Sequence, residues 1–192
     1  MLFRSLAIVK LEQNLQDRFA LITQNVDGLH IRAGNTAGRT CEIHGNINLM
    51  RCSRECTDKT FAIPAELEFE HKDRELSLQE KSLLICPECL TLARPHILWF
   101  DECYDEIYYK FETSISITER TDLLIVIGTT GNTTLPSRII TSVMRKNKPV
   151  IVIDPFENEV TSMIKQYDRG YYLSCKSGEI VPEICDTVTS DQ

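Results

Sequence analysis

Apolar runs alternate with stretches of mixed polarity along much of this chain. The clearest run is Asp122–Gly128, where five apolar residues follow one another, as expected for a strand covered on both faces. Val150–Ile153 is a second run of this kind, whereas residues 5–16 place apolar side chains at helical spacing. Because strands alternate with helices, the pattern predicts an α/β fold with a doubly wound, Rossmann-like parallel sheet.

The same patterns predict the remaining elements. Pro136 is expected near the start of a helix, since proline suits the first helical turn. Extended segments are predicted at residues 19–23, 41–44, 47–51, 97–100 and 171–174, and helices at 26–33, 105–119, 136–146, 158–166 and 179–188.

Residues 52–93 differ from the rest in composition. They are charged and irregular, and a pair of cysteines lies at each end. We interpret them as a small inserted zinc-binding module. The flanking segments, residues 1–51 and 94–192, are then expected to form one Rossmann-like domain.

The two cysteine pairs have the spacing of a metal site. Cys52 and Cys56 are separated by three residues, and Cys86 and Cys89 by two, so each pair can present two sulfurs from one turn. Four thiolates bind Zn²⁺ tetrahedrally and leave no open position, so the predicted ion is structural. The alternative is four unrelated buried cysteines. Outside these pairs, ordinary small core residues are expected at Cys41, Cys103, Cys175 and Cys185.

Charge and composition narrow the class of protein. The chain has 192 residues, of which 42% are hydrophobic, and a formal net charge of −7. That charge argues against a dedicated nucleic-acid binder and suits a basic partner such as a lysine-bearing protein. No apolar stretch is long enough to span a bilayer, and no signal peptide is recognised. With clustered cysteines, this predicts a cytoplasmic protein without membrane association.

A polar block follows the apolar run at residues 19–22. Gln24 and Asn25 carry amides that both donate and accept hydrogen bonds, which suits sugar hydroxyls or a carboxamide. Asp27 accepts only, and His44 titrates near neutrality, which makes it the natural general base. Taken alone, His44 could be a hydrogen-bonded structural histidine. The block at the end of a strand predicts a polar ligand there.

Two later strand ends carry further polar groups. Gly128, Thr129 and Thr130 follow one apolar run, and backbone N–H groups of such a loop can meet a phosphate. Asp154 ends the next strand, where a carboxylate can bind a ribose hydroxyl. Thr129 and Thr130 could also simply terminate a strand. Three polar strand ends together are the pattern of a nucleotide site.

In order and spacing, these motifs resemble the sirtuins, which are NAD-dependent protein-lysine deacylases. The likeness covers most of residues 6–185, including the cysteine pairs, and is carried by Thr23–His30, Glu42–Gly45, Arg94–Glu102, Gly128–Thr130 and Val150–Asp154. It implies NAD as cofactor, one structural Zn²⁺, an acyl-lysine protein or peptide as substrate, and transfer of the acyl group to ADP-ribose with release of nicotinamide.

The resemblance also assigns roles to single residues. His44 would be the general base and Asn25 a second catalytic residue. Trp99, Phe100, Asp101 and Glu102 would form a substrate groove that pairs with the peptide as an added strand; Trp99 and Phe100 could instead be core residues. The cofactor contacts would be Gln24, Asn25, Val26, Asp27, Gly128, Thr129, Thr130 and Asp154.

The chain also departs from the sirtuin pattern. The family's glycine-rich phosphate loop does not precede residues 5–16, and without it the pyrophosphate loses backbone donors. A truncated, internally started or split sirtuin with weak NAD binding and slow turnover is therefore expected. Asp101 and Asp154 replace a usual glycine and a usual asparagine. Two alternatives stay open: a non-catalytic, zinc-stapled binding fragment and a mono-ADP-ribosyltransferase.

Overall fold

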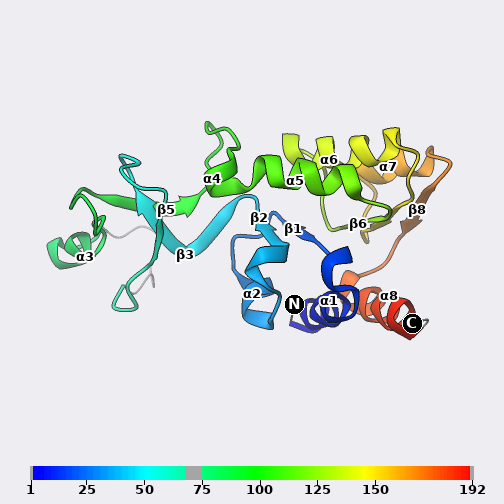
Figure 1. Ribbon diagram of the computed structural model, residues 1–192, viewed down its shortest axis with the longest axis horizontal. Helices are drawn as coiled ribbons and strands as arrows, with labels where there is room; N and C mark the ends of the chain where they lie inside the picture. The colour runs from blue at the N-terminus through cyan, green and yellow to red at the C-terminus, as the bar shows by residue number, and fades with distance from the viewer. Residues whose placement is uncertain (1, 68–74, 191–192) are drawn as a thin grey trace. The chain divides into compact units, whose positions relative to one another are not determined.

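The computed structural model describes residues 2–67 and 75–190. Its contacts divide the chain into two compact units. The parallel-sheet unit consists of residues 1–22, 29–41 and 110–192, and the cysteine unit consists of residues 23–28 and 42–109. Figure 1 shows the elements of each unit along the chain.

The parallel-sheet unit is built on three parallel strands. The strands β6 (Leu124–Ile127), β7 (Val150–Ile153) and β8 (Gly170–Leu173) lie in that order and pair in step, residue for residue. Parallel strands need helical crossovers, which here are α6 (Thr134–Arg145) and α7 (Glu159–Lys165). The predicted parallel sheet is confirmed.

Alternate side chains of these strands enter two separate cores. Val126, Val150 and Val152 pack with residues of α6 and α7 on one face. Ile153 packs on the other face with residues of α1 (Leu2–Leu15) and α8 (Ser177–Ser190). Helices therefore cover both faces of the sheet (Figure 1), which explains why its strands are apolar throughout. Burying each Val or Ile contributes about 1.5–3 kcal/mol.

A buried carboxylate ties α1 to the segment after α2 (Leu29–Ala33). Glu12 is only 3% exposed, and its carboxylate accepts hydrogen bonds from the Asn35 side chain at 2.6 Å and from the Thr36 N–H at 3.2 Å. The Arg39 guanidinium forms an ion pair with this carboxylate, with 3.6 Å between Arg39 Nη1 and Glu12 Oε1. Burial alone would raise the pKa of Glu12, but the hydrogen bonds from Thr36 and Asn35 hold it below its usual value.

The cysteine unit is built on an antiparallel sheet. Its central strand β3 (Gly45–Cys52) pairs with β4 (Thr60–Ala62) on one side and β5 (Ala93–Ile97) on the other. A register shift between Asn46 and Met50 interrupts the pairing with β5. The remaining elements, across both units, are η1 (Gln16–Arg18), β1 (Leu21–Thr23), η2 (Ala37–Arg39), β2 (Thr40–Glu42), α3 (Leu78–Leu83), α4 (Glu106–Tyr109) and α5 (Phe111–Arg120); β1 pairs with β2.

Two predicted elements are wrong in extent. The strand expected at 97–100 is β5, which ends at Ile97, and the chain then turns: the Glu102 N–H donates to the Trp99 carbonyl at 3.1 Å. The helix expected at 105–119 is split into α4 and α5, because Lys110 between them adopts a left-handed φ of 54°. Both interruptions come from local backbone conformation, which the spacing of apolar residues does not predict.

Two further predicted segments are shorter than expected. The helix expected at 26–33 begins only at Leu29, because Gly28 before it has a φ of 65°. The strand expected at 41–44 ends at Glu42, and His44 lies in the turn between β2 and β3. The candidate base therefore lies on a turn.

Candidate active site and metal centre

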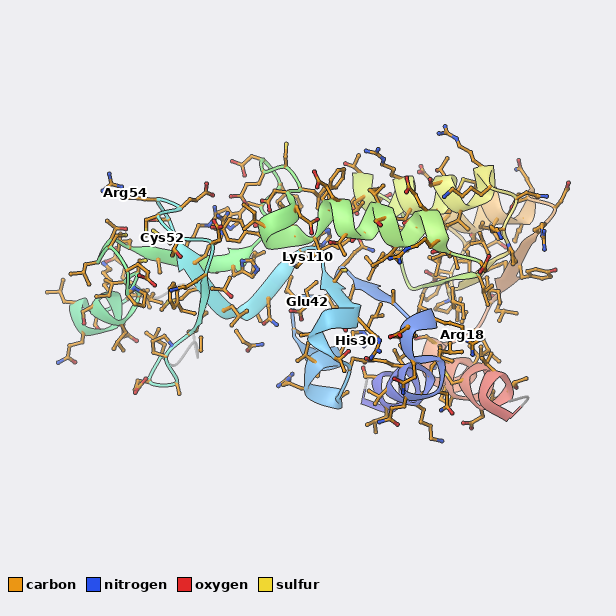
Figure 2. All side chains as sticks on the ribbon, viewed as in Figure 1. Arg18, His30, Glu42, Cys52, Arg54 and Lys110 are labelled. Atoms are coloured by element: carbon orange, nitrogen blue, oxygen red, sulfur yellow. The ribbon has the colours of Figure 1, made fainter. Side chains whose placement is uncertain are left out.

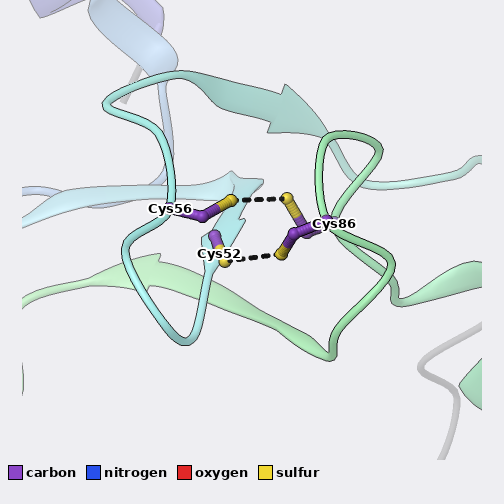
Figure 3. A group of neighbouring side chains, drawn as sticks. Cys52, Cys56 and Cys86 are labelled. Carbon is purple, nitrogen blue, oxygen red and sulfur yellow. Dashed lines mark hydrogen bonds between the residues drawn. The ribbon is translucent and has the colours of Figure 1, made fainter.

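Four cysteine sulfurs gather at one end of the β3–β5 sheet. All four Sγ atoms, from Cys52, Cys56, Cys86 and Cys89, lie within 4.8 Å of one another. The Sγ atoms of Cys52 and Cys89 are 3.5 Å apart, and those of Cys56 and Cys86 are 3.6 Å apart (Figure 3). A tetrahedral Zn²⁺ with Zn–S bonds of about 2.3 Å requires sulfurs about 3.8 Å apart. The cluster therefore fits a four-thiolate zinc site.

Each cysteine pair is carried by a tight turn. In the first, the Glu55 N–H donates to the Cys52 carbonyl at 3.2 Å; in the second, the Leu90 N–H donates to the Cys86 carbonyl at 2.9 Å. Glu55 and Leu90 have left-handed φ values of 52° and 59°, which close both turns. Arg54, on the first turn, points away from the sheet (Figure 2).

Backbone donors prepare one of these thiols to lose its proton. Hydrogen bonds from the Cys56 and Arg54 backbone lower the pKa of Cys52 to about 6. Neighbouring sulfurs, that of Cys89 first, raise the pKa of Cys56. Crowded thiols resist becoming thiolates together, and a divalent cation removes that repulsion.

A second cluster of polar groups surrounds His44. The segment after β1 runs beside the turn that carries His44, because the Ile43 N–H donates to the Thr23 carbonyl at 3.0 Å and the Ile47 N–H to the Val26 carbonyl at 2.8 Å. These two bonds hold Gln24, Asn25 and Val26, with Asp27 next in the chain, beside the turn that carries His44. The structure thus brings the predicted polar block and the predicted base into one local arrangement.

The His44 turn is fixed on both sides. The Leu98 N–H donates to the His44 carbonyl at 3.0 Å, and a hydrogen bond joins His44 to the Gln24 backbone. Gly45 has a φ of 83°, and a Cβ there would lie 2.0 Å from the His96 carbonyl oxygen, so only glycine fits. His44 is half-buried; burial lowers its pKa, and the Gln24 backbone bond opposes that change. A largely neutral imidazole at neutral pH is the form a general base needs.

Two residues of this cluster, Tyr104 and Glu42, received no role from the sequence. Tyr104 places its hydroxyl oxygen 2.8 Å from His44 Nε2, with the two rings stacked at 5.9 Å between centroids. Glu42, at the end of β2 (Figure 2), accepts from the Asn46 side chain at 3.0 Å. Burial raises the pKa of Glu42, and nearby Asp27 adds to that rise. Nothing in the sequence pattern links Tyr104 to His44, because the two residues are 60 positions apart.

The later strand ends lie at the carboxyl edge of the parallel sheet. The Gly128 N–H donates to the Ile153 carbonyl at 3.1 Å, which places the end of β6 beside the end of β7. Asp154 is buried, and its carboxylate accepts from the Phe156 N–H at 2.9 Å and the Asn158 side chain at 3.3 Å. Thr129 Oγ1 accepts from the Gly131 N–H at 3.2 Å. The predicted cofactor contacts thus fall in two groups, one in each unit.

The predicted groove residues form a turn. Trp99 and Phe100 are strongly exposed, so the alternative that they are core residues is wrong. The Glu102 carboxylate accepts from the Trp99 N–H at 2.9 Å and pairs with Arg94, and with Arg51 at 3.3 Å. Glu102 therefore anchors the turn, while Trp99 and Phe100 present apolar surface beside it.

Comparisons with known proteins assign the chain to a family. The profile of the Sir2 family matches residues 4–134. An NAD-dependent protein deacylase of Leptospira interrogans serogroup Icterohaemorrhagiae serovar Lai (strain 56601) is 33% identical over 185 residues, which cover 93% of this chain and 63% of that protein. The chain belongs to the Sir2 family, and the sirtuin resemblance is confirmed.

Solved structures give the same result for the fold. A Sir2 homologue in complex with NAD superimposes with a TM-score of 0.77 and 26% identity, covering 98% of this chain and 65% of that one. A mutant Sir2 homologue in complex with 2'-O-acetyl ADP ribose superimposes with a TM-score of 0.74 and 28% identity, covering 98% and 66%. The chain thus spans less than two thirds of the Leptospira deacylase and of both these structures.

Across the described residues, no helix combines the length and the apolar character that a membrane crossing requires.

Proposed function

We propose that this chain acts in NAD-dependent deacylation of protein lysine, with transfer of the acyl group to ADP-ribose and release of nicotinamide. The observation that carries the proposal is the arrangement of His44 against the Gln24–Asp27 segment, fixed by backbone hydrogen bonds on both sides. Support comes from the Leptospira relative, a protein deacylase, and from Sir2 homologues that bind NAD and 2'-O-acetyl ADP ribose.

In this proposal His44 accepts a proton from a ribose hydroxyl. Its half-buried, largely neutral imidazole suits that task, and the bond to the Gln24 backbone holds the ring in place. Asn25, Gln24, Val26 and Asp27 would surround the nicotinamide and its ribose. Since an amide oxygen is a weak nucleophile, positioning of the reactants and a cationic leaving group supply most of the rate enhancement.

The remaining assignments follow from the same proposal. Gly128, Thr129 and Thr130 would contact the cofactor through the carboxyl edge of the parallel sheet, and Asp154 would bind its ribose. NAD supplies the electrophilic ribose carbon and the leaving nicotinamide. Trp99, Phe100, Asp101 and Glu102 would border the acyl-lysine peptide, with the two exposed aromatic side chains as its apolar contact.

We further propose that residues 52–93 act as a module stapled by one structural Zn²⁺ within a Rossmann-like protein of residues 1–51 and 94–192. The four clustered sulfurs support this, because they close the coordination shell of a tetrahedral ion.

Eight free cysteines, four of them arranged to bind a metal ion, favour a reducing compartment and hence a cytoplasmic protein. No nucleic-acid partner is proposed, given the net charge of −7.

Nicotinamide release from NAD in the presence of an acetylated peptide tests the proposed reaction. The expected result is peptide-dependent release that falls at least 100-fold in the His44→Ala variant, because general-base contributions are about 10²–10⁴-fold. Tyr171→Phe, at an exposed position of β8, is the matched control and should keep full activity.

Two other outcomes would contradict the proposal. Transfer of labelled ADP-ribose from NAD onto protein, without loss of the peptide's acetyl group, would identify an ADP-ribosyltransferase. Peptide binding without any nicotinamide release would identify a binding fragment. Mass spectrometry of the peptide separates both outcomes from deacylation.

A further inference from the structure

Tyr104 contacts His44 directly, and the proposed reaction leaves it without a role. Its hydroxyl oxygen is 2.8 Å from His44 Nε2, and its ring stacks on the imidazole with an interplanar angle of 28°. Both side chains are half-buried, which strengthens a hydrogen bond between them relative to one in water.

The second contact of the imidazole decides which way this hydrogen bond runs. His44 also bonds to the Gln24 backbone, and that bond favours the charged ring, as expected when a ring N–H donates to a carbonyl. Since Nε2 faces Tyr104, Nδ1 is left as the donor to Gln24. A neutral imidazole with its proton on Nδ1 must accept at Nε2, so the Tyr104 O–H donates to His44.

Tyr104 is itself held from two sides. Before it, the Trp99–Glu102 turn is closed by the Glu102 carboxylate, which also pairs with Arg94. After it, the Asp105 carboxylate accepts from the Tyr108 N–H at 2.6 Å and fixes the start of α4. The hydroxyl therefore reaches His44 from a short, braced segment.

We propose that Tyr104 is a positioning residue for His44. Its hydroxyl selects the Nδ1-protonated tautomer and holds the ring in orientation while no substrate is bound. It then releases Nε2 when a substrate hydroxyl arrives to donate in its place. No proton leaves Tyr104 in this exchange: one O–H···N bond replaces another. This role rests on the proposed function, because it takes His44 as the base.

Titration of the His44 imidazole by NMR tests the contact without requiring catalysis. The chain has four histidines, so ¹³C-histidine labelling gives few signals, and the His44 signal is the one lost in His44→Ala. Tyr104→Phe removes the hydroxyl and keeps the stacked ring. Because the hydroxyl bond stabilises the neutral imidazole, the His44 pKa is expected to rise by about half a unit to one unit.

Burial lowers the pKa of His44 and the Gln24 backbone bond raises it, and neither contact is altered by Tyr104→Phe. Tyr171→Phe, on the exposed face of β8, should leave the His44 titration unchanged. Tyr104→Leu, which removes ring and hydroxyl together, should raise the His44 pKa at least as much as Tyr104→Phe. An unchanged His44 pKa in Tyr104→Phe would overturn the proposal.

The pH profile of deacylation separates this inference from the proposed function. The acidic limb of kcat/KM should move upward in Tyr104→Phe by the same amount as the NMR titration. A shifted titration in a protein that shows no deacylation would support the Tyr104–His44 contact and reject the proposed activity. Deacylation with identical acidic limbs in both proteins would reject the role of Tyr104 and keep the activity.

Discussion

At the scale of single residues, the geometry around His44 depends on a few positions that tolerate little change. Gly45 is the sharpest case, because its left-handed φ and its approach to the His96 carbonyl both exclude a Cβ. The sequence pattern indicated His44 as the candidate base. Gly45, the next residue, allows the tight turn that sets the position of the His44 side chain.

Gly45→Ala is expected to lower the free energy of unfolding by about 2–4 kcal/mol, because the new Cβ would lie 2.0 Å from a backbone oxygen that cannot move freely. Urea denaturation followed by circular dichroism measures the change. Gly38→Ala is the control: a Cβ at Gly38 meets nothing within 4 Å, so its effect should stay within about 0.5 kcal/mol. Equal stabilities for both variants would refute the steric argument.

Glu12 gives a prediction in pH. Its pKa in the folded protein lies below the ordinary 4.5, so the carboxylate stabilises the fold above the unfolded value and loses that contribution as the pH falls through the folded value. Glu12→Gln should cost about 1–3 kcal/mol at pH 7. The difference from the original protein should shrink progressively below about pH 4.5.

Thermal or urea unfolding of both proteins between pH 3 and pH 7 checks this pH dependence. Glu119→Gln, on the exposed side of α5, serves as control and should change stability little at any pH. A Glu12→Gln difference that stays constant down to pH 3 would show that the carboxylate is not the stabilising form.

At the scale of elements, apolar runs identified the strands β6 and β7 and the helices around them, because burial on both faces leaves a continuous signal. The sequence pattern did not show where predicted elements are interrupted. Lys110 ends one helix and precedes another through its φ alone, and the Trp99–Glu102 turn depends on side-chain bonds of Glu102. Of the candidate site, His44, the polar block and the cysteines could be named from residue type and spacing, whereas the Tyr104 contact depends on folding distant segments together.

The turns that carry the cysteines give a prediction for the metal. Cys86→Ser should abolish stoichiometric zinc binding, because four-coordinate thiolate sites lose most of their affinity with one ligand. Zinc content of the purified protein, measured by atomic emission, should fall from about one per chain to near zero. Cys103→Ser, at an exposed cysteine outside the cluster, should retain the full complement. Retained zinc in Cys86→Ser would show that the cluster is not the binding site.

At the scale of the whole molecule, two units with separate interiors are expected to respond separately to loss of metal. The two cores of the parallel-sheet unit are formed by its own strands and helices. The cysteine unit has a three-stranded sheet whose loops converge on four sulfurs, so metal binding contributes directly to its folding.

Chelation of zinc should therefore speed amide hydrogen exchange across β3 and β5 by at least tenfold, while exchange in β6 and β7 changes little. Hydrogen-exchange mass spectrometry before and after dialysis against a chelator measures both regions in one sample. Uniform acceleration across the chain would show that the two units unfold as one.

The register between β3 and β5 carries one more consequence. Gly45 is paired with Ile97 at one end of that ladder, and Cys52 is paired with Ala93 at the other. His44, next to Gly45, therefore lies at one end of the β3–β5 strand pair, and the cysteine cluster lies at the other end. If the proposed function holds, a chelating agent is expected to lower the activity by loosening this strand pair, although four thiolates leave the ion no open position for a reactant.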